Sequence, residues 1–120
     1  MKFTKMQGSG NDFIVIDDRK NEFSGKESKL GVKLCNRHFG IGGDGVLIVR
    51  KSKIAQIKMI IINSDGSYAS MCGNGIRCFA KYVWDNHLIE GSNIRIETGD
   101  GIKEAFLNIA GNKVKEVTVD

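Results

Sequence analysis

The sequence predicts an α+β fold in which a curved mixed or antiparallel sheet, or a barrel, wraps around one central buried helix. Three observations support this prediction: several short β-branched runs, one helical segment that is apolar nearly all round, and a final third that alternates apolar and polar residues between glycine turns. The chain has 120 residues and no linker, repeat or low-complexity segment, so we expect one domain over residues 1–120.

Four strands are expected in the first half of the chain, at residues 2–7, 12–18, 46–49 and 57–63. The second contains Phe13-Ile14-Val15-Ile16, a continuous apolar run that is typical of a strand covered on both faces. The two glycines of Gly8-Ser9-Gly10-Asn11 predict a turn before it. A helix is expected near residues 26–38, with Gly40 as its stop.

In the last third, alternation predicts three more strands, at residues 94–97, 102–109 and 114–119. Glycine-containing turns separate them, so we expect an antiparallel meander. Before the meander, residues 72–88 place apolar side chains at the i, i+3, i+4, i+7 and i+8 positions of a helix: Ile76, Phe79, Ala80, Val83 and Trp84. Tyr82 extends this apolar surface, while Arg77, Lys81 and Asp85 form one narrow polar stripe. This is the helix that we expect to be buried.

The composition excludes several classes of protein. Apolar residues make up 41% and charged residues 27%, which is too balanced for a disordered tail, and the absence of proline excludes collagen-like chains. No apolar run approaches the roughly 18 residues that span a bilayer, and the first residues lack a secretory signal, so we expect no membrane association and a cytoplasmic location. The net charge of +4 is scattered, which favours a solvated basic face over a nucleic-acid site.

The three cysteines are Cys35, Cys72 and Cys78. Their odd number and the lack of a Cys-x-x-Cys pair argue against a disulfide scaffold. Cys72 and Cys78 would lie ~120° apart around one helix, which argues against a zinc site, so we expect no metal. Cys35 and Cys78 are interpreted as small core residues.

Residues 40–45 match the pattern G-x-G-x-x-G, which also occurs in dinucleotide-binding loops. That fingerprint needs a strand before it and a helix after it, whereas here the predicted order is reversed. We therefore expect no nucleotide cofactor, and we interpret the glycines as a tight turn that needs positive φ. A glycine loop can also admit a ligand against bare backbone, and this alternative stays open.

Met71-Cys72-Gly73-Asn74-Gly75 lies at the mouth of the predicted buried helix. The first-turn amides of a helix have no partner within it, and together with the helix dipole they attract anions. The dipole stabilises a thiolate at Cys72 by roughly 0.3–2 kcal/mol. The flanking glycines would let a carboxylate approach the amides. Asn74 can cap the helix or bind a ligand, and Asn63 ends the strand before this segment.

Four blocks of the sequence together resemble the diaminopimelate epimerase family: residues 5–13, 36–45, 63–67 and 71–78. The resemblance implies two pseudo-symmetric domains around a cleft, each with strands wrapped around a helix, of which this chain holds the amino-terminal one. It also implies interconversion of LL- and meso-diaminopimelate for lysine and peptidoglycan precursor synthesis, without pyridoxal phosphate, metal or other cofactor. A homodimer is expected.

The resemblance assigns roles to five residues of this chain. Cys72 matches the cysteine that removes the α-proton, and Gly73 and Asn74 match residues that hold the substrate's α-carboxylate and amine end. Asn11 and Asn63 match side chains that bind the substrate. Some family members carry glutamine where this chain has Gly45, so a contact made by that side chain is not expected here.

The family's second Cys-Gly-x-Gly block and its Glu-Arg pair are absent from this sequence. Cys78 cannot replace the second cysteine because it lies about a turn and a half down the same helix as Cys72. We therefore expect an incomplete, inactive half-site, in which the other half is a missing carboxy-terminal domain, a separate chain, or a second copy opposing its own Cys72. The alternatives are another cofactor-independent racemase of this architecture and a non-catalytic ligand-binding or interaction module.

The remaining polar candidates are interpreted structurally. Arg37 and His38 are placed at the end of the first helix and His87 at the end of the second, where cations interact favourably with the helix dipole. Asp17-Asp18 is interpreted as a strand-end turn.

Overall fold

The structure is a computed structural model that describes residues 2–8 and 10–120. Ser9 of the predicted first turn lies outside the described residues. In chain order, the elements are β1 (Thr4–Gly8), β2 (Asn11–Asp17), α1 (Glu27–Cys35), β3 (Gly45–Arg50), β4 (Ile57–Asn63), β5 (Tyr68–Ala69), α2 (Gly73–Asp85), β6 (Asn93–Thr98), β7 (Gly101–Ala110) and β8 (Lys113–Val119).

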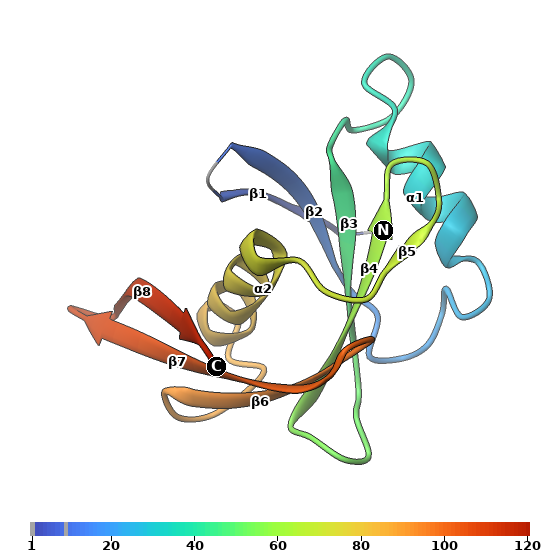
Figure 1. Cartoon of the computed structure of the whole chain (residues 1–120). Helices are drawn as coiled ribbons and strands as arrows, with labels where there is room; N and C mark the ends of the chain where they lie inside the picture. The colour runs from blue at the N-terminus through green and yellow to red at the C-terminus, as the bar shows by residue number, and fades with distance from the viewer. Residues whose placement is uncertain (1, 9) are drawn as a thin grey trace.

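The strands form one mixed sheet in the order β1-β2-β3-β4-β6-β7-β8, with the short β5 paired to β4. The β2–β3 and β4–β6 pairs are parallel, and the other pairs are antiparallel. The sheet curls so that α2 lies between β1–β2 on one side and β7–β8 on the other (Figure 1). The predicted curved mixed sheet around a central helix is therefore confirmed.

The strands β2, β3 and β4 are apolar on both faces because each face packs against a different helix. Phe13 and Val15 of β2 join the cluster around α2, whereas Ile14 and Ile16 join a second cluster with Leu34 and Cys35 of α1. The continuous apolar run in β2 was the basis for predicting this double coverage. By contrast, β6 and β7 bury only alternate residues, as expected of a meander that is covered on one face.

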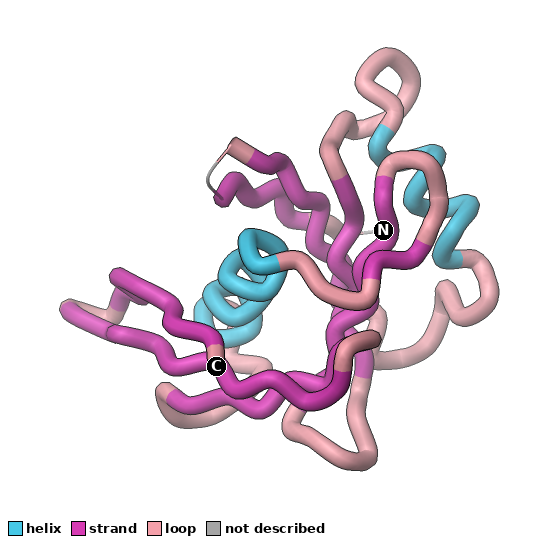
Figure 2. The backbone as a smooth tube through the Cα atoms, viewed as in Figure 1, coloured by secondary structure: helices cyan, strands magenta, loops and turns pink. Residues whose placement is uncertain are grey.

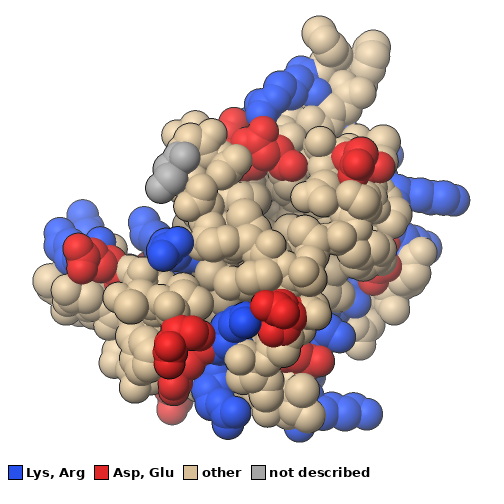
Figure 3. All heavy atoms as spheres, viewed as in Figure 1, with Lys and Arg blue, Asp and Glu red and all other residues tan. Residues whose placement is uncertain are grey.

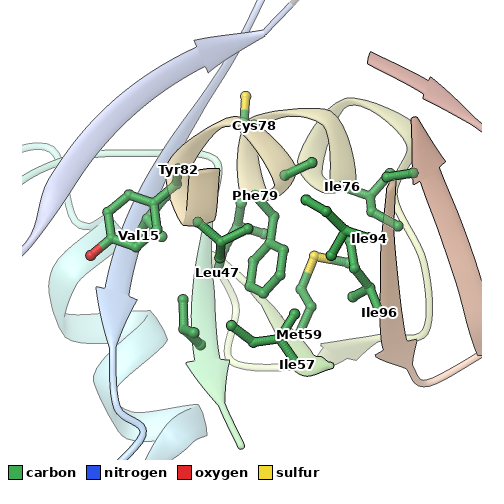
Figure 4. Close-up of a cluster of buried hydrophobic side chains, with 14 of the residues drawn as sticks. Val15, Leu47, Ile57, Met59, Ile76, Cys78, Phe79, Tyr82, Ile94 and Ile96 are labelled. Carbon is green, nitrogen blue, oxygen red and sulfur yellow. The ribbon is translucent and has the colours of Figure 1, made fainter. Parts of the chain in front are cut away.

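The helix α2 carries the centre of the core. Phe79 is fully buried and points towards Ile57 and Met59, while Cys78 points to another side of the helix (Figure 4). The three charged positions of its predicted stripe are all exposed. Tyr82 is buried, and Trp84 is partly buried and packs against the core. The predicted burial pattern of this helix is therefore confirmed.

The predicted helical segment 72–88 is too long at its carboxyl end. The helix ends at Asp85, and His87 takes a positive φ of 58°. The N–H of Leu88 donates to the carbonyl of Val83 at 2.9 Å and that of His87 to Trp84 at 3.1 Å, which is the Schellman arrangement. His87 therefore closes this helix through its backbone.

The predicted helix at residues 26–38 also ends early, at Cys35. Asn36 is extended, and its Oδ1 accepts the N–H groups of His38 at 2.8 Å and Phe39 at 2.9 Å. This side-chain turn competes with the helical backbone bonds. The placement of Arg37 and His38 at the helix end was therefore wrong, because both lie in the loop beyond it.

Asp18 is more than part of a turn. Only 2% of it is exposed, and its carboxylate accepts the Nε of Arg50 at 2.8 Å and the backbone N–H of Glu22 at 2.7 Å. Arg50 also donates to Glu27 at 2.9 Å. This buried network joins the ends of β2 and β3 to the start of α1, and nothing in the sequence pattern had indicated it.

Candidate active site

Cys72 occupies the N-cap position of α2. Its backbone is extended, with φ −147° and ψ 119°, and its Sγ accepts the N–H of Gly75 at 3.4 Å. The loop between β5 and α2 delivers it to this position (Figure 2). A Cβ at Gly75 would lie 3.3 Å from Cys72 Cβ and 3.5 Å from its Sγ, so the glycine leaves room for the thiol. Cys72 is partly exposed, as a reacting group requires.

The first turn of α2 forms the floor of the candidate site. Gly73 is exposed and Asn74 is half-buried, and they follow the capping cysteine directly. Because first-turn amides have no partner within their helix, this end of α2 can bind a carboxylate beside the Cys72 thiol. The geometry therefore combines an anion-binding backbone with a nucleophilic or basic sulfur.

Asn11, the first residue of β2, lies at the same place and is aligned with Gly8 of β1. The Nδ2 of Asn74 donates to the Oδ1 of Asn11 at 2.8 Å, although the two residues lie far apart in the sequence. Gly8 permits this approach, because a Cβ there would lie 3.5 Å from the Asn74 carbonyl oxygen and 2.9 Å from Cys78 Sγ. The structure therefore groups Asn11, Cys72, Gly73 and Asn74, four of the five predicted site residues.

Asn63, the fifth predicted residue, lies at the same end of the sheet. Strand register aligns it with Gly45 of β3, which in turn aligns with Phe13 of β2. Its Nδ2 donates to Ser67 Oγ at 3.0 Å, and its backbone N–H donates to the Ser67 carbonyl at 2.8 Å. Among the described residues it makes no direct hydrogen bond to Asn11 or to Cys72–Asn74.

A charged cluster beside Asn11 was missed by the sequence analysis. The Asp44 carboxylate accepts the Asp12 N–H at 2.7 Å, and Arg37 reaches Asp44 at 3.3 Å and Asp12 at 3.4 Å. The Asp12 N–H, helped by the Asn11 side chain and by Arg37, holds the pKa of Asp44 below its usual range. The only signal in the sequence was an aspartate within the glycine-rich segment.

The other two cysteines have different surroundings. Burial raises the pKa of Cys78, as does the nearby Cys72, and burial likewise raises the pKa of Cys35. Both are buried, so both are held as neutral thiols away from solvent. Their burial agrees with their interpretation as core residues.

The glycine-rich segment joins α1 to β3, so the predicted order of helix, glycine loop and strand is confirmed. Gly42 has a φ of 84° and packs beside Arg37, as expected for a tight turn. In the described part of the chain, no group of three or more His, Cys, Asp or Glu side chains is arranged to hold a metal ion. Neither α1 nor α2 is long and apolar enough to span a lipid bilayer. Acidic and basic side chains are intermixed on the face shown in Figure 3.

Solved structures with the same fold include one named as an epimerase and one named as an isomerase. A hydroxyproline epimerase from Agrobacterium vitis with bound trans-4-hydroxy-L-proline gives a TM-score of 0.78 at 16% identity, over 98% of this chain and 40% of that one. A methylitaconate-delta-isomerase gives 0.75 at 13% identity, over 94% of this chain and 35% of that one. At these identities the similarity establishes the fold alone.

Sequence comparison is more specific. A diaminopimelate epimerase of Clostridium perfringens is 58% identical over 120 residues, which is all of this chain and 44% of that protein. One from Caldanaerobacter subterraneus subsp. tengcongensis is 52% identical over 119 residues, covering 99% of this chain and 42% of that protein. The chain thus spans less than half the length of these curated relatives. The family model described as diaminopimelate epimerase matches residues 3–120, and with this agreement along its whole length the chain belongs to the diaminopimelate epimerase family.

Proposed function

We propose that this chain forms one half of a cofactor-independent epimerase site that interconverts LL- and meso-diaminopimelate. One observation supports this more than any other: Cys72 caps α2 directly beside the hydrogen-bonded pair of Asn11 and Asn74. Curated relatives that bear the name diaminopimelate epimerase match the chain from end to end. The reaction would supply lysine and peptidoglycan precursors in the cytoplasm.

The α-proton of an amino acid is a very weak acid, so its removal needs both a base and stabilisation of the charge that develops. In the proposed step, the Cys72 thiolate takes the α-proton: the C–H bond breaks, an S–H bond forms, and the electron pair spreads into the α-carboxylate. The amides of Gly73 and Asn74 would hold that carboxylate and stabilise the developing charge. Asn11 and Asn63 would bind the remaining polar groups of the substrate.

Inversion also needs an acid that delivers a proton to the opposite face of the carbon. Cys78 does not meet this need, because it is buried and lies within α2, about a turn and a half beyond Cys72. We propose that the second acid is a cysteine of the family's other domain, and that this chain without it is an inactive half-site. No pyridoxal phosphate or metal takes part in the proposed chemistry.

The test is incubation with diaminopimelate in deuterated water. Two quantities are measured: deuterium incorporation at the α-carbon and the change in its stereochemistry. Three samples are compared: the chain alone, the chain mixed with the separately made carboxy-terminal part of the Clostridium perfringens relative, and a fusion chain that joins residues 1–120 to that part. We expect turnover in the mixture or the fusion chain, and loss of turnover with Cys72→Ala. A correctly folded fusion chain that binds but never exchanges the α-proton would contradict the proposal.

A non-catalytic ligand-binding module is the second candidate, because one half of a two-base site can bind a ligand without turning it over. This candidate predicts that diaminopimelate binds to the chain and that no partner restores exchange.

We also propose that two copies associate as a homodimer. If the two copies oppose their Cys72 groups, the chain alone would invert the substrate. Sedimentation velocity across a hundredfold range of concentration measures the association of two copies directly. A monomer at every concentration would contradict the dimer.

A further inference from the structure

Asp44 binds the backbone of Asp12, the residue that follows Asn11. Its Oδ2 accepts the Asp12 N–H at 2.7 Å, and its own N–H donates to the Asp12 carbonyl at 2.8 Å. Asp44, in the loop between α1 and β3, therefore binds both the N–H and the carbonyl of Asp12. These bonds fix the start of β2, where the Asn11 side chain turns towards α2.

The Asn11 side chain extends from this bound backbone to α2. Its Oδ1 accepts the Nδ2 of Asn74 at 2.8 Å. Because an amide oxygen only accepts hydrogen bonds, this contact fixes which end of the Asn74 amide faces Asn11. Asp44 is thus linked to Asn74 through the Asp12 backbone and the Asn11 side chain.

Arg37 keeps the carboxylate in place. Its guanidinium reaches Asp44 Oδ1 at 3.3 Å and Asp12 Oδ2 at 3.4 Å, and all three side chains are partly exposed. Ion pairs of this kind contribute little to folding. Asp44 is ionised near neutral pH, as an ordinary aspartate is, and the Asp12 N–H, the Asn11 side chain and Arg37 lower its pKa. The cluster is therefore suited to orienting neighbouring groups more than to stabilising the fold.

We propose that Asp44 is a positioning residue: by binding the Asp12 backbone it sets the position of the Asn11 amide and, through Asn11, that of Asn74 at the mouth of α2. The positioning itself does not depend on the reaction. Its consequence for catalysis rests on the proposed function, in which Asn11 and Asn74 contact the substrate and Asp44 does not.

The first test examines the positioning in the chain as it exists. In a ¹⁵N-labelled sample, the side-chain NH₂ resonances of Asn11 and Asn74 are compared between the unsubstituted chain and Asp44→Ala. We expect both pairs of resonances to shift. Asp17→Ala is the matched control, because Asp17 also accepts a backbone N–H, from Arg19 at 3.2 Å, and pairs with that arginine, but at the other end of β2. It should leave both pairs of resonances unchanged.

The second test measures the catalytic consequence in the fusion chain. Asp44→Ala should raise KM for diaminopimelate about tenfold, which corresponds to about 1.4 kcal/mol, with a smaller change in kcat. In a background that already carries Asn11→Ala, it should have little further effect, because the residue through which it acts is gone. Asp17→Ala should change neither constant.

An Asn74 resonance that does not move in Asp44→Ala would overturn the proposal, as would effects of Asp44→Ala and Asn11→Ala that multiply in full. If Asp44→Ala fails to fold, Asp44→Asn replaces it, since it keeps one acceptor for the Asp12 N–H and loses the negative charge. An inactive but folded fusion chain without substitutions would contradict the proposed function, and the NMR comparison would still decide whether Asp44 positions the two amides.

Discussion

Strands β2 and β3 run side by side from one end of the sheet to the other, and their two ends are built from different chemistry. We call the end with Asn11, Asp44 and Cys72 the site end; there the polar groups are exposed or half-buried and the groups proposed to meet the substrate are amides and a thiol. We call the other the charged end; there Arg50 lies buried between Asp18 and Glu27.

The difference follows from what each end does with its polar groups. At the charged end, burial is tolerated because the arginine is paired with both carboxylates, and removal of the arginine would leave two buried negative charges without their cation. At the site end, the groups keep bonding capacity for a ligand, and few of their contacts are buried enough to stabilise the fold strongly. Substitutions at the two ends should therefore affect different quantities.

The largest expected effect is on catalysis at the site end. Cys72→Ala in the fusion chain should lower turnover on the order of 10²–10⁴-fold, the range that a positioned general base contributes. It should lower the free energy of unfolding by only about 1 kcal/mol, the usual cost of losing an N-cap side chain. Deuterium exchange at the α-carbon measures the first and urea unfolding the second. Cys78→Ala is the matched control on the same helix and should retain turnover. Equal losses in the two variants would refute the assignment of Cys72.

The charged end should show the reverse pattern. Arg50→Met should lower the free energy of unfolding by about 3–5 kcal/mol, because it leaves Asp18 and Glu27 buried without their cation. Lys51→Met, at an exposed neighbouring position, should cost less than about 0.5 kcal/mol. Urea unfolding monitored through Trp84 fluorescence provides both values. A cost for Arg50→Met near that of Lys51→Met would show that the network is dispensable.

These two ends also differ in how far the sequence predicted them. The fold and three of the four grouped site residues follow from local patterns: apolar periodicity places α2, glycines mark the turns, and Cys72, Gly73 and Asn74 lie at the helix mouth. The fourth, Asn11, was indicated by the family resemblance alone. The Arg50 network could not be predicted, because it joins three elements that are distant in sequence and its members look like ordinary surface charges. Nothing in residue spacing indicates that Asp18 is buried.

Helix ends were the other weak point, for a similar reason. The periodic pattern of α1 continues past Cys35, but the side chain of Asn36 bonds the next backbone N–H groups and ends the helix. Consequently Arg37 is free to pair with Asp12 and Asp44, a contact that depends on tertiary structure. The two-residue β5 was not predicted either, since so short a strand has no period to detect.

Thiol reactivity should distinguish Cys72 from the two buried cysteines. Cys72 should react with iodoacetamide at least about tenfold faster than Cys78 or Cys35 in the folded chain near neutral pH, because burial raises the pKa of the other two and hides them from the reagent. Mass spectrometry of peptides from a time course measures the three rates. In urea the rates should converge, and three similar rates in the folded chain would contradict the distinction.

The smallest expected effect concerns acid. Burial raises the pKa of Glu27, but hydrogen bonds from its own backbone N–H, from Arg50 and from Tyr68 lower it by more. The pKa of Glu27 therefore lies below its ordinary value. A carboxyl whose pKa is lower in the folded state stabilises the fold fully above its unfolded pKa of about 4.3, and this contribution is lost as pH falls through the folded pKa. Glu27→Gln should therefore reduce the dependence of unfolding free energy on pH below about pH 4.5, by at most ~1.4 kcal/mol per pH unit. Asp44→Asn at the exposed site end acts in the same direction, and 1 M salt, which screens its pairing with Arg37, should reduce its share more than that of the buried Glu27. Equal salt sensitivity in the two variants would mean that burial does not distinguish the two ends.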